Sequence, residues 1–271
     1  MGARMRRLIR FPCADAMLSG SLDEGAGTVG LLCVTGGSQV RSGPHRMLHQ
    51  LASRVAQAGY PGFRYERRGL GDSDGEDPGY RNSGRDLAAA AEAFRKQAPH
   101  VRTLVGFGLC DGATTLALHG RGAGIDALVL ANPWLVETAP DELAPAATKA
   151  HYRGRFLSPK AWAGVFTGKV DVIGAARSLL GAATKSETSS LADEVASSLV
   201  PYAGKTTLIL AERDGTAIAA QACWKSAAFD HVRADDVIAI QTDAHTFARE
   251  GNQEQLAQAV IAFIQRMSVI N

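Results

Sequence analysis

Several features that would mark particular protein classes are missing from this chain of 271 residues. The formal net charge is only +2, which is too small to argue for nucleic-acid binding. No window approaches the ~20 apolar residues of a membrane-spanning helix. The basic N-terminus lacks the apolar core, about 7–15 residues long, of a secretory signal peptide. We therefore expect a cytoplasmic protein with no membrane span and no nucleic-acid partner.

Cysteine and aromatic residues are also scarce. The four cysteines (Cys13, Cys33, Cys110 and Cys223) lie far apart, and none has the spacing of a metal site. We expect reduced thiols and no structural metal. Aromatic residues make up 6% of the chain, whereas glycine occurs 29 times, which suggests many tight turns. A hydrophobic content of 46% excludes global disorder.

Strand and helix patterns alternate through 28–131 and again through 206–266. Apolar runs predict strands at 7–11, 17–22, 28–35, 62–65, 101–107, 127–131, 206–211 and 237–240. Helical spacing occurs at 45–58, 84–97, 111–119 and 253–266. This alternation predicts an α/β fold with a mostly parallel sheet and right-handed crossovers. Residues 135–204 break the pattern and read as a helical cap, so the core comprises 1–134 and 205–271.

The segment Gly108-Leu109-Cys110-Asp111-Gly112 has the form of a nucleophile elbow, G-x-Nuc-x-G. It follows an apolar strand and precedes a predicted helix, which is the context that the motif requires. Side chains at the two glycine positions would collide with the neighbouring strand and helix. The helix N-terminus would favour a thiolate at Cys110. The alternative is a buried cysteine beside a glycine-rich turn.

A nucleophile at Cys110 needs a base and an acid from later in the chain, in the order nucleophile, acid, histidine. His245 follows the last predicted strand and fits the base, whereas His231 precedes that strand. Asp214 directly follows the strand at 206–211 and is the favoured acid. Glu212 and Asp243 are the rival acids.

An oxyanion hole is expected from the turn after the strand at 28–35. Gly36, Gly37 and Ser38 stand there, and one of their N–H groups would act together with the N–H of Asp111. The alternative is that the two glycines only turn the chain.

With these residues in view, the chain resembles the α/β-hydrolases, and more narrowly the exosortase A system-associated hydrolase 1 family. The matching stretches are GGSQVRSGPHR at 36–46, AGYPGFRYERRGLGDSDGE at 58–76, GLCDG at 108–112, HYRGRFLSPKAW at 151–162, ERDGTA at 212–217 and AHTF at 244–247. The resemblance implies a Cys110–Asp214–His245 triad, with no metal and no organic cofactor. Two departures from the family pattern are Gly62, in a strand where bulkier residues are usual, and Gly112, where alanine is frequent.

These residues predict hydrolysis of an ester or thioester through an acyl-enzyme. The same intermediate would serve an acyltransferase, and a hydrolase-fold binding protein without turnover is a further alternative. We expect a small-molecule or carrier-bound acyl substrate. Its pocket would be lined by aromatic residues just before the cap and within it, namely Trp134, Tyr152, Phe156 and Trp162. The alternative is that several of these side chains pack the cap onto the core. Basic residues at 41–46, 64–68 and 149–160 would favour an anionic carrier if they met at the pocket mouth, and are otherwise a solvated surface.

Overall fold

The computed structural model describes residues 6–137, 190–202, 205–232 and 236–270. The strands are β1 (Arg6–Cys13), β2 (Ala16–Asp23), β3 (Val29–Val34), β4 (Gly62–Tyr65), β5 (Thr103–Leu109), β6 (Ala127–Ala131), β7 (Thr206–Ala211) and β8 (Asp236–Ile240). The α-helices are α1 (Met47–Gln57), α2 (Gly79–Asn82), α3 (Gly84–Gln97), α4 (Asp111–His119), α8 (Ser190–Leu199), α9 (Gly215–Trp224) and α10 (Asn252–Ile270). Short 3-10 turns occur at Pro44–Arg46, Val200–Tyr202 and Ala227–Phe229.

The eight strands form one sheet in the order β1-β2-β4-β3-β5-β6-β7-β8. Strand β2 pairs antiparallel with both β1 and β4, and every other neighbouring pair is parallel. The prediction of a mostly parallel sheet is therefore confirmed. All eight predicted strands are present, because each is an apolar run too short to form a helix of ordinary length.

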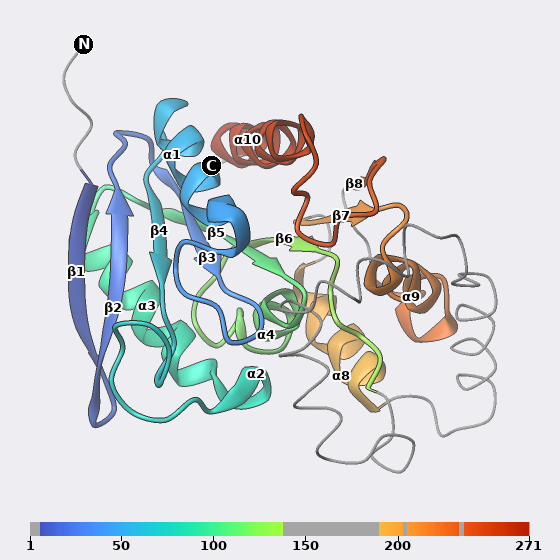
Figure 1. Ribbon diagram of the computed structural model, residues 1–271, viewed down its shortest axis with the longest axis horizontal. Helices are drawn as coiled ribbons and strands as arrows, with labels where there is room; N and C mark the ends of the chain where they lie inside the picture. The colour runs from blue at the N-terminus through green and yellow to red at the C-terminus, as the bar shows by residue number, and fades with distance from the viewer. Residues whose placement is uncertain (1–5, 138–189, 203–204, 233–235, 271) are drawn as a thin grey trace, which may run out of the picture.

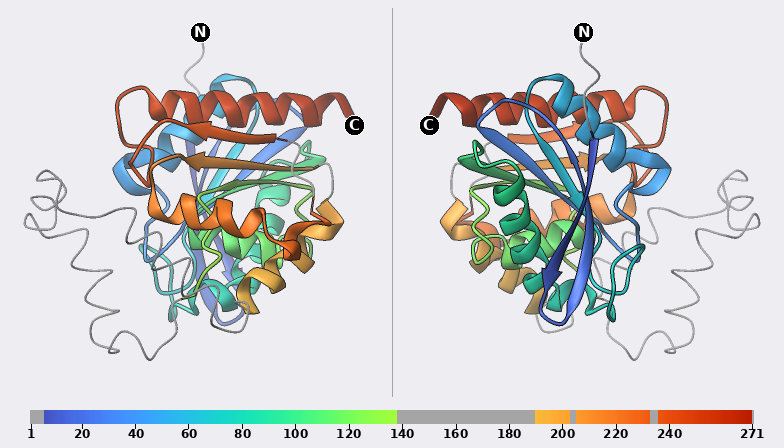
Figure 2. Two further views of the ribbon diagram at one scale, coloured as in Figure 1. Left: turned by 90° about the vertical axis from the view of Figure 1, so that its right-hand side faces the viewer. Right: turned by 90° about the vertical axis from the view of Figure 1, so that its left-hand side faces the viewer.

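Helices cover both faces of the sheet (Figures 1 and 2). Helices α1 and α10 lie on one face, and α3, α4, α8 and α9 lie on the other. Alternate residues of each strand enter different cores: Phe107 of β5 packs on the α1 and α10 side, while Leu104 packs on the other. Since both faces are covered, the central strands are continuous apolar runs rather than alternating ones.

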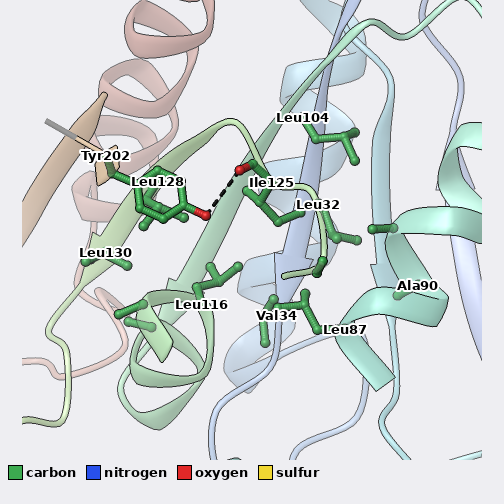
Figure 3. Close-up of a cluster of buried hydrophobic side chains, with 14 of the residues drawn as sticks. Leu32, Val34, Leu87, Ala90, Leu104, Leu116, Ile125, Leu128, Leu130 and Tyr202 are labelled. Carbon is green, nitrogen blue, oxygen red and sulfur yellow. Dashed lines mark hydrogen bonds between the residues drawn. The ribbon is translucent and has the colours of Figure 1, made fainter. Parts of the chain in front are cut away.

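Figure 3 shows part of the core on the α3, α4 and α8 side. Leu32, Leu116 and Leu128 are fully buried there, and they come from a strand, a helix and a second strand. Tyr202 is buried among these side chains, and its hydroxyl donates a hydrogen bond to the carbonyl of Ile125 at 3.1 Å. This bond satisfies a polar group that would otherwise be costly to bury.

Helices α2 and α9 lie where no helix was predicted, and α8 lies within the segment 135–204 that was predicted to be a helical cap. Helix α9 starts directly after the strand β7, and α8 follows the polar stretch that precedes residue 190. Leu191, Val195 and Leu199 of α8 are buried in the same core as α4. The boundaries of the cap remain a prediction, because most of 135–204 lies outside the described residues. Among the described helices, none combines the length and apolarity needed to span a membrane.

Candidate active site

Cys110 occupies the turn between β5 and α4, as the elbow motif predicts. Its backbone has φ 58° and ψ −127°, a conformation that costs a non-glycine residue of the order of 1–3 kcal/mol. Its N–H donates to the carbonyl of Ala131 at 3.0 Å, and its own carbonyl accepts the N–H of Ala113 at 3.0 Å. The strained turn is thereby fixed to β6 on one side and to the first turn of α4 on the other.

Close backbone packing explains the two glycines of the elbow. A Cβ at Gly108 would lie 2.5 Å from the carbonyl oxygen of Gly112. A Cβ at Gly112 would lie 2.8 Å from the carbonyl oxygens of both Val34 and Thr35. Helix α4 therefore begins closer to β5 than a side chain at Gly108 allows, and closer to the end of β3 than a side chain at Gly112 allows. Both contacts fit the glycine preference expected from the motif.

Cys110 differs from the other three cysteines in its surroundings. Cys13 and Cys33 are buried, and burial raises the pKa of Cys33 to about 12. Burial also raises the pKa of Cys13 and of Cys223. Cys110 is partly exposed at the N-terminus of α4, where the helix dipole favours a thiolate.

Asp214 and His245 meet at the carboxyl ends of the strands. Asp214 follows β7 and caps α9, and its Oδ2 accepts the N–H of Ala217 at 2.9 Å. The same Oδ2 lies 2.9 Å from Nδ1 of His245, in the loop between β8 and α10. The side chains are only 25% (His245) and 12% (Asp214) exposed, so solvent screens their interaction weakly.

His245 also contacts the cysteine of the elbow. Burial lowers the pKa of its imidazole, but hydrogen bonds with Asp214 and Cys110 and the charges of both groups raise that pKa to about 10. Both partners therefore favour the protonated form of the imidazole. Cys110, His245 and Asp214 therefore lie at one place, although they come from three separate loops.

The rival acids and the rival histidine lie elsewhere. Asp243 makes an ion pair with Arg249 at 2.9 Å, and the hydrogen bond from Arg249 lowers its pKa. Glu212 and His231 are exposed to solvent. Of the three candidate acids, Asp214 is the one that contacts His245.

The turn after β3 has an unexpected partner. The N–H of Gly37 donates to Oδ1 of Asp111 at 2.5 Å, so the side chain of Asp111 reaches the residues whose backbone was predicted to bind an oxyanion. Gly36 is buried beside this contact, and Ser38 is exposed. The structure thus brings Gly36, Gly37 and Asp111 together, through a carboxylate that the sequence analysis did not consider.

A buried acid holds the loop that follows this turn. Glu66 comes directly after β4, and its carboxylate accepts the Arg41 backbone N–H at 3.0 Å and the Arg41 guanidinium at 2.6 Å. It also accepts the backbone N–H of Asp72 at 2.9 Å. Glu66 therefore joins the segment 36–46 to the segment 66–72, both of which lie within matching stretches of the sequence.

The basic residues at 41–46 and 64–68, which were expected to surround the pocket entrance, are largely neutralised by ion pairs. Arg41 pairs with Glu66 and Asp72, and Arg64 pairs with Asp23. Two further pairs are Arg67 with Asp77 and Arg68 with Asp86. The basic residues at 149–160 lie outside the described part of the chain. The described arginines therefore give little support to an anion-binding mouth.

Sequence reasoning missed the role of Asn132. This residue follows β6, is fully buried and has φ 42°. Its Nδ2 donates to the carbonyl of His245 at 2.8 Å, and its Oδ1 accepts the N–H of Ala211 at 2.8 Å. Asn132 thereby ties the histidine loop to the end of β7. A polar residue directly after an apolar strand was the available signal.

Only one of the predicted pocket aromatics lies among the described residues. Trp134 is partly buried against the core, and its backbone N–H donates to the carbonyl of Cys110 at 3.3 Å. Tyr152, Phe156 and Trp162 lie outside the described residues. Within the described ranges, no cluster of three or more histidine, cysteine or acidic side chains is placed to hold a metal ion.

Comparisons with known proteins establish the fold. No protein-family model matches the chain, and neither does any curated sequence. Solved structures of α/β-hydrolases do match. The esterase Pf2001 of Pyrococcus furiosus is 17% identical, with a TM-score of 0.65 over 97% of this chain and 93% of its own. The α/β hydrolase GrgF from Penicillium sp. sh18 is also 17% identical, with a TM-score of 0.65 over 97% and 98%.

A third similar structure is the dienelactone hydrolase of Anabaena variabilis. It is 15% identical, with a TM-score of 0.62 over 97% of this chain and 98% of its own. At these identities the likeness is one of fold. The predicted α/β-hydrolase fold is therefore confirmed, and the narrower resemblance to the exosortase-associated family stays a prediction.

Proposed function

We propose that this protein is a hydrolase of esters or thioesters that works through an acyl-enzyme on Cys110. One observation carries the proposal, namely that His245 is hydrogen-bonded to Asp214 at 2.9 Å while the charge of Cys110 acts on the same imidazole. A thiolate paired with an imidazolium is an activated nucleophile. The esterases and hydrolases among the similar folds agree with this reaction class, and so does the resemblance to the exosortase-associated hydrolases.

In the proposed first step, the Cys110 sulfur attacks the substrate carbonyl carbon and forms a C–S bond. The carbonyl electron pair moves to oxygen, and backbone N–H groups stabilise the oxyanion. When the oxyanion collapses, the bond to the leaving group breaks and His245 gives its proton to that group. The products of this half-reaction are a thioester on Cys110 and a free alcohol or thiol.

In the second step, His245 takes a proton from water as the water attacks the thioester. Collapse of the second tetrahedral intermediate breaks the C–S bond and releases a carboxylic acid. Asp214 holds the imidazole in the tautomer that these transfers need and stabilises its cation. No residue in this scheme requires a metal or an organic cofactor.

The test uses p-nitrophenyl esters and acyl thioesters of varied chain length, with intact-mass detection of the protein. We expect an adduct of one acyl group on Cys110 and none on the Cys110→Ala variant. Turnover retained by Cys110→Ala would refute the nucleophile, and full activity of Cys110→Ser would refute the need for a thiolate. Product analysis with added alcohols or amines distinguishes hydrolysis from acyl transfer. A wild-type protein that never acylates would favour the binding-protein alternative.

A further inference from the structure

The side chain of Asp111 has a position that the proposed mechanism does not use. Its backbone N–H is a proposed oxyanion donor, yet its Oδ1 accepts the N–H of Gly37, one of the candidates for the second donor, at 2.5 Å. The two residues are 74 positions apart in the sequence, so the contact depends on the pairing of β3 with β5. A carboxylate oxygen therefore occupies the hydrogen-bonding position that a substrate oxyanion would take on Gly37.

The surroundings are shaped to hold this carboxylate. A Cβ at Gly36 would lie 2.7 Å from Oδ1 of Asp111 and 2.4 Å from the carbonyl oxygen of Leu109. The missing side chain of Gly36 thus leaves the space that the carboxylate fills. The cation that lowers the pKa of Asp111 is Arg67, which is itself paired with Asp77 at 2.6 Å. The charge of Asp111 is therefore only partly compensated.

An oxyanion and an ionised carboxylate cannot share one N–H donor without strong repulsion. Two like charges at hydrogen-bond distance disfavour each other, and the effect is larger away from water. Burial raises the pKa of Asp111, against the lowering effects of the Gly37 N–H and Arg67, so protonation is one way to remove the charge. Displacement of the side chain by the substrate is the other.

We propose that the Asp111 carboxylate is a built-in occupant of the oxyanion hole, which slows acylation of Cys110 until it is displaced or neutralised. This inference rests on the proposed function, because it concerns the same cysteine and the same oxyanion donors. It assigns the side chain of Asp111 a role in selecting substrates, since a good substrate must supply enough binding energy to displace the carboxylate from the N–H of Gly37.

The test compares two reactions of the same thiol. Acylation of Cys110 by p-nitrophenyl acetate forms an oxyanion, whereas alkylation by iodoacetamide displaces iodide at a saturated carbon and forms none. We divide the rate constant for acylation of Cys110 by the rate constant for its alkylation, both measured by peptide mass spectrometry. Changes in the amount or reactivity of the thiolate affect both reactions and cancel, so this ratio measures how well the oxyanion is stabilised. A residue with a merely structural role would not raise this ratio.

Two substitutions separate the effect of the Asp111–Gly37 hydrogen bond from the effect of the carboxylate charge. Asp111→Ala removes the acceptor and should raise the ratio by about tenfold or more, since one oxyanion donor is worth ~10²–10³ in rate. Asp111→Asn keeps an acceptor for Gly37 but removes the charge, and should raise the ratio by a smaller factor. The matched control is Asp126→Asn, whose carboxylate accepts the N–H of Leu104 at 2.8 Å on an exposed loop and should leave the ratio unchanged.

The wild-type protein provides a second measurement that does not depend on the folding of any variant. The ratio should fall as the pH rises through the titration of Asp111, because the protonated carboxyl is neutral and the ionised one repels an oxyanion. The charged side chain that acts on Asp111 is Arg67, which is paired with Asp77, and Cys110 is its neighbour in the sequence. Cys110 is the attacking group in both reactions, so a change in its reactivity with pH cancels in the ratio.

The outcomes distinguish this inference from the proposed function. Acylation at Cys110 with a ratio that is unchanged or lower in both Asp111 variants, and flat with pH in the wild type, would overturn the inference alone. Alkylation of Cys110 without acylation in the wild type and in Asp111→Ala would overturn both the inference and the proposed function.

Discussion

The middle of the sheet and its carboxyl-terminal edge are parts of the same strands, but their polar side chains have different surroundings. In the middle, Cys33 is buried in the core on the α1 and α10 side of the sheet, and burial raises its pKa to about 12. At the edge, the side chains of Asn132 and Asp111 contact backbone groups of distant loops. The contrast teaches that strand interiors supply stability, while the ends of the strands gather polar groups at one place.

The reactivity of the two cysteines is the sharpest measure of this contrast. We expect iodoacetamide at pH 7 to alkylate Cys110 at least about 10³-fold faster than Cys33 in the native protein, because Cys33 is buried and almost wholly protonated. Peptide mass spectrometry after timed quenching measures both rates. Equal labelling of the two sites in folded protein would break the comparison.

Replacing the acid at the edge should have the next largest effect. Asp214→Asn retains an oxygen that can cap α9, but it loses the charge that stabilises the His245 cation. We expect kcat/KM for p-nitrophenyl esters to fall by about 10²-fold. The control is Asp243→Asn, which alters a carboxylate of the histidine loop that pairs with Arg249 instead. A similar loss in both variants would contradict the assignment of Asp214.

Removal of Asn132 tests the connection between loops. Asn132→Ala leaves the Ala211 N–H and the His245 carbonyl without their partner, which costs about 1–3 kcal/mol for each buried group left unsatisfied. We expect a lower free energy of unfolding in urea, and kcat/KM about tenfold lower because the His245 loop is less well placed. If stability falls while kcat/KM is unchanged, Asn132 supports the fold but does not position the histidine.

The Cys110–His245 pair also predicts how stability depends on pH. The folded pKa of His245, about 10, lies above its unfolded value of about 6.5, so folding binds a proton to the ring. This contribution is fully present below pH 6.5 and is lost as the pH rises through about 10. Urea unfolding at several pH values measures it. The loss should be smaller in His245→Asn, and an identical pH profile would contradict the pairing.

The smallest effect concerns two glycines that begin helices at this edge. Gly112→Ala would place a Cβ 2.8 Å from the carbonyl oxygens of Val34 and Thr35, and should lower the free energy of unfolding by about 1–3 kcal/mol. Gly215→Ala meets no atom within 4 Å at the start of α9, and should be neutral or stabilising by up to about 1 kcal/mol. Thermal or urea unfolding compares them. Equal stability of the two variants would show that α4 can shift away from β3.

Much of the architecture could be predicted because its signals are local. Apolar runs marked all eight strands, and the glycines around Cys110 marked the turn between β5 and α4. The order of Cys110, Asp214 and His245 along the chain was enough to nominate the triad. Helix α9 was missed because its sequence, GTAIAAQACW, is apolar on all sides and lacks the one-sided pattern of a surface helix.

The sequence by itself determined which segments become strands, where the chain must turn sharply and which residue types stand at the ends of the strands. Only the tertiary structure decided which of those residues touch. Asn132 reaches His245 across 113 residues, and the Asp111 carboxylate reaches Gly37 across 74. The physical reason is that local patterns depend on the preferences of neighbouring residues, whereas these contacts depend on strand order and register, which bring loops together only after the sheet has formed.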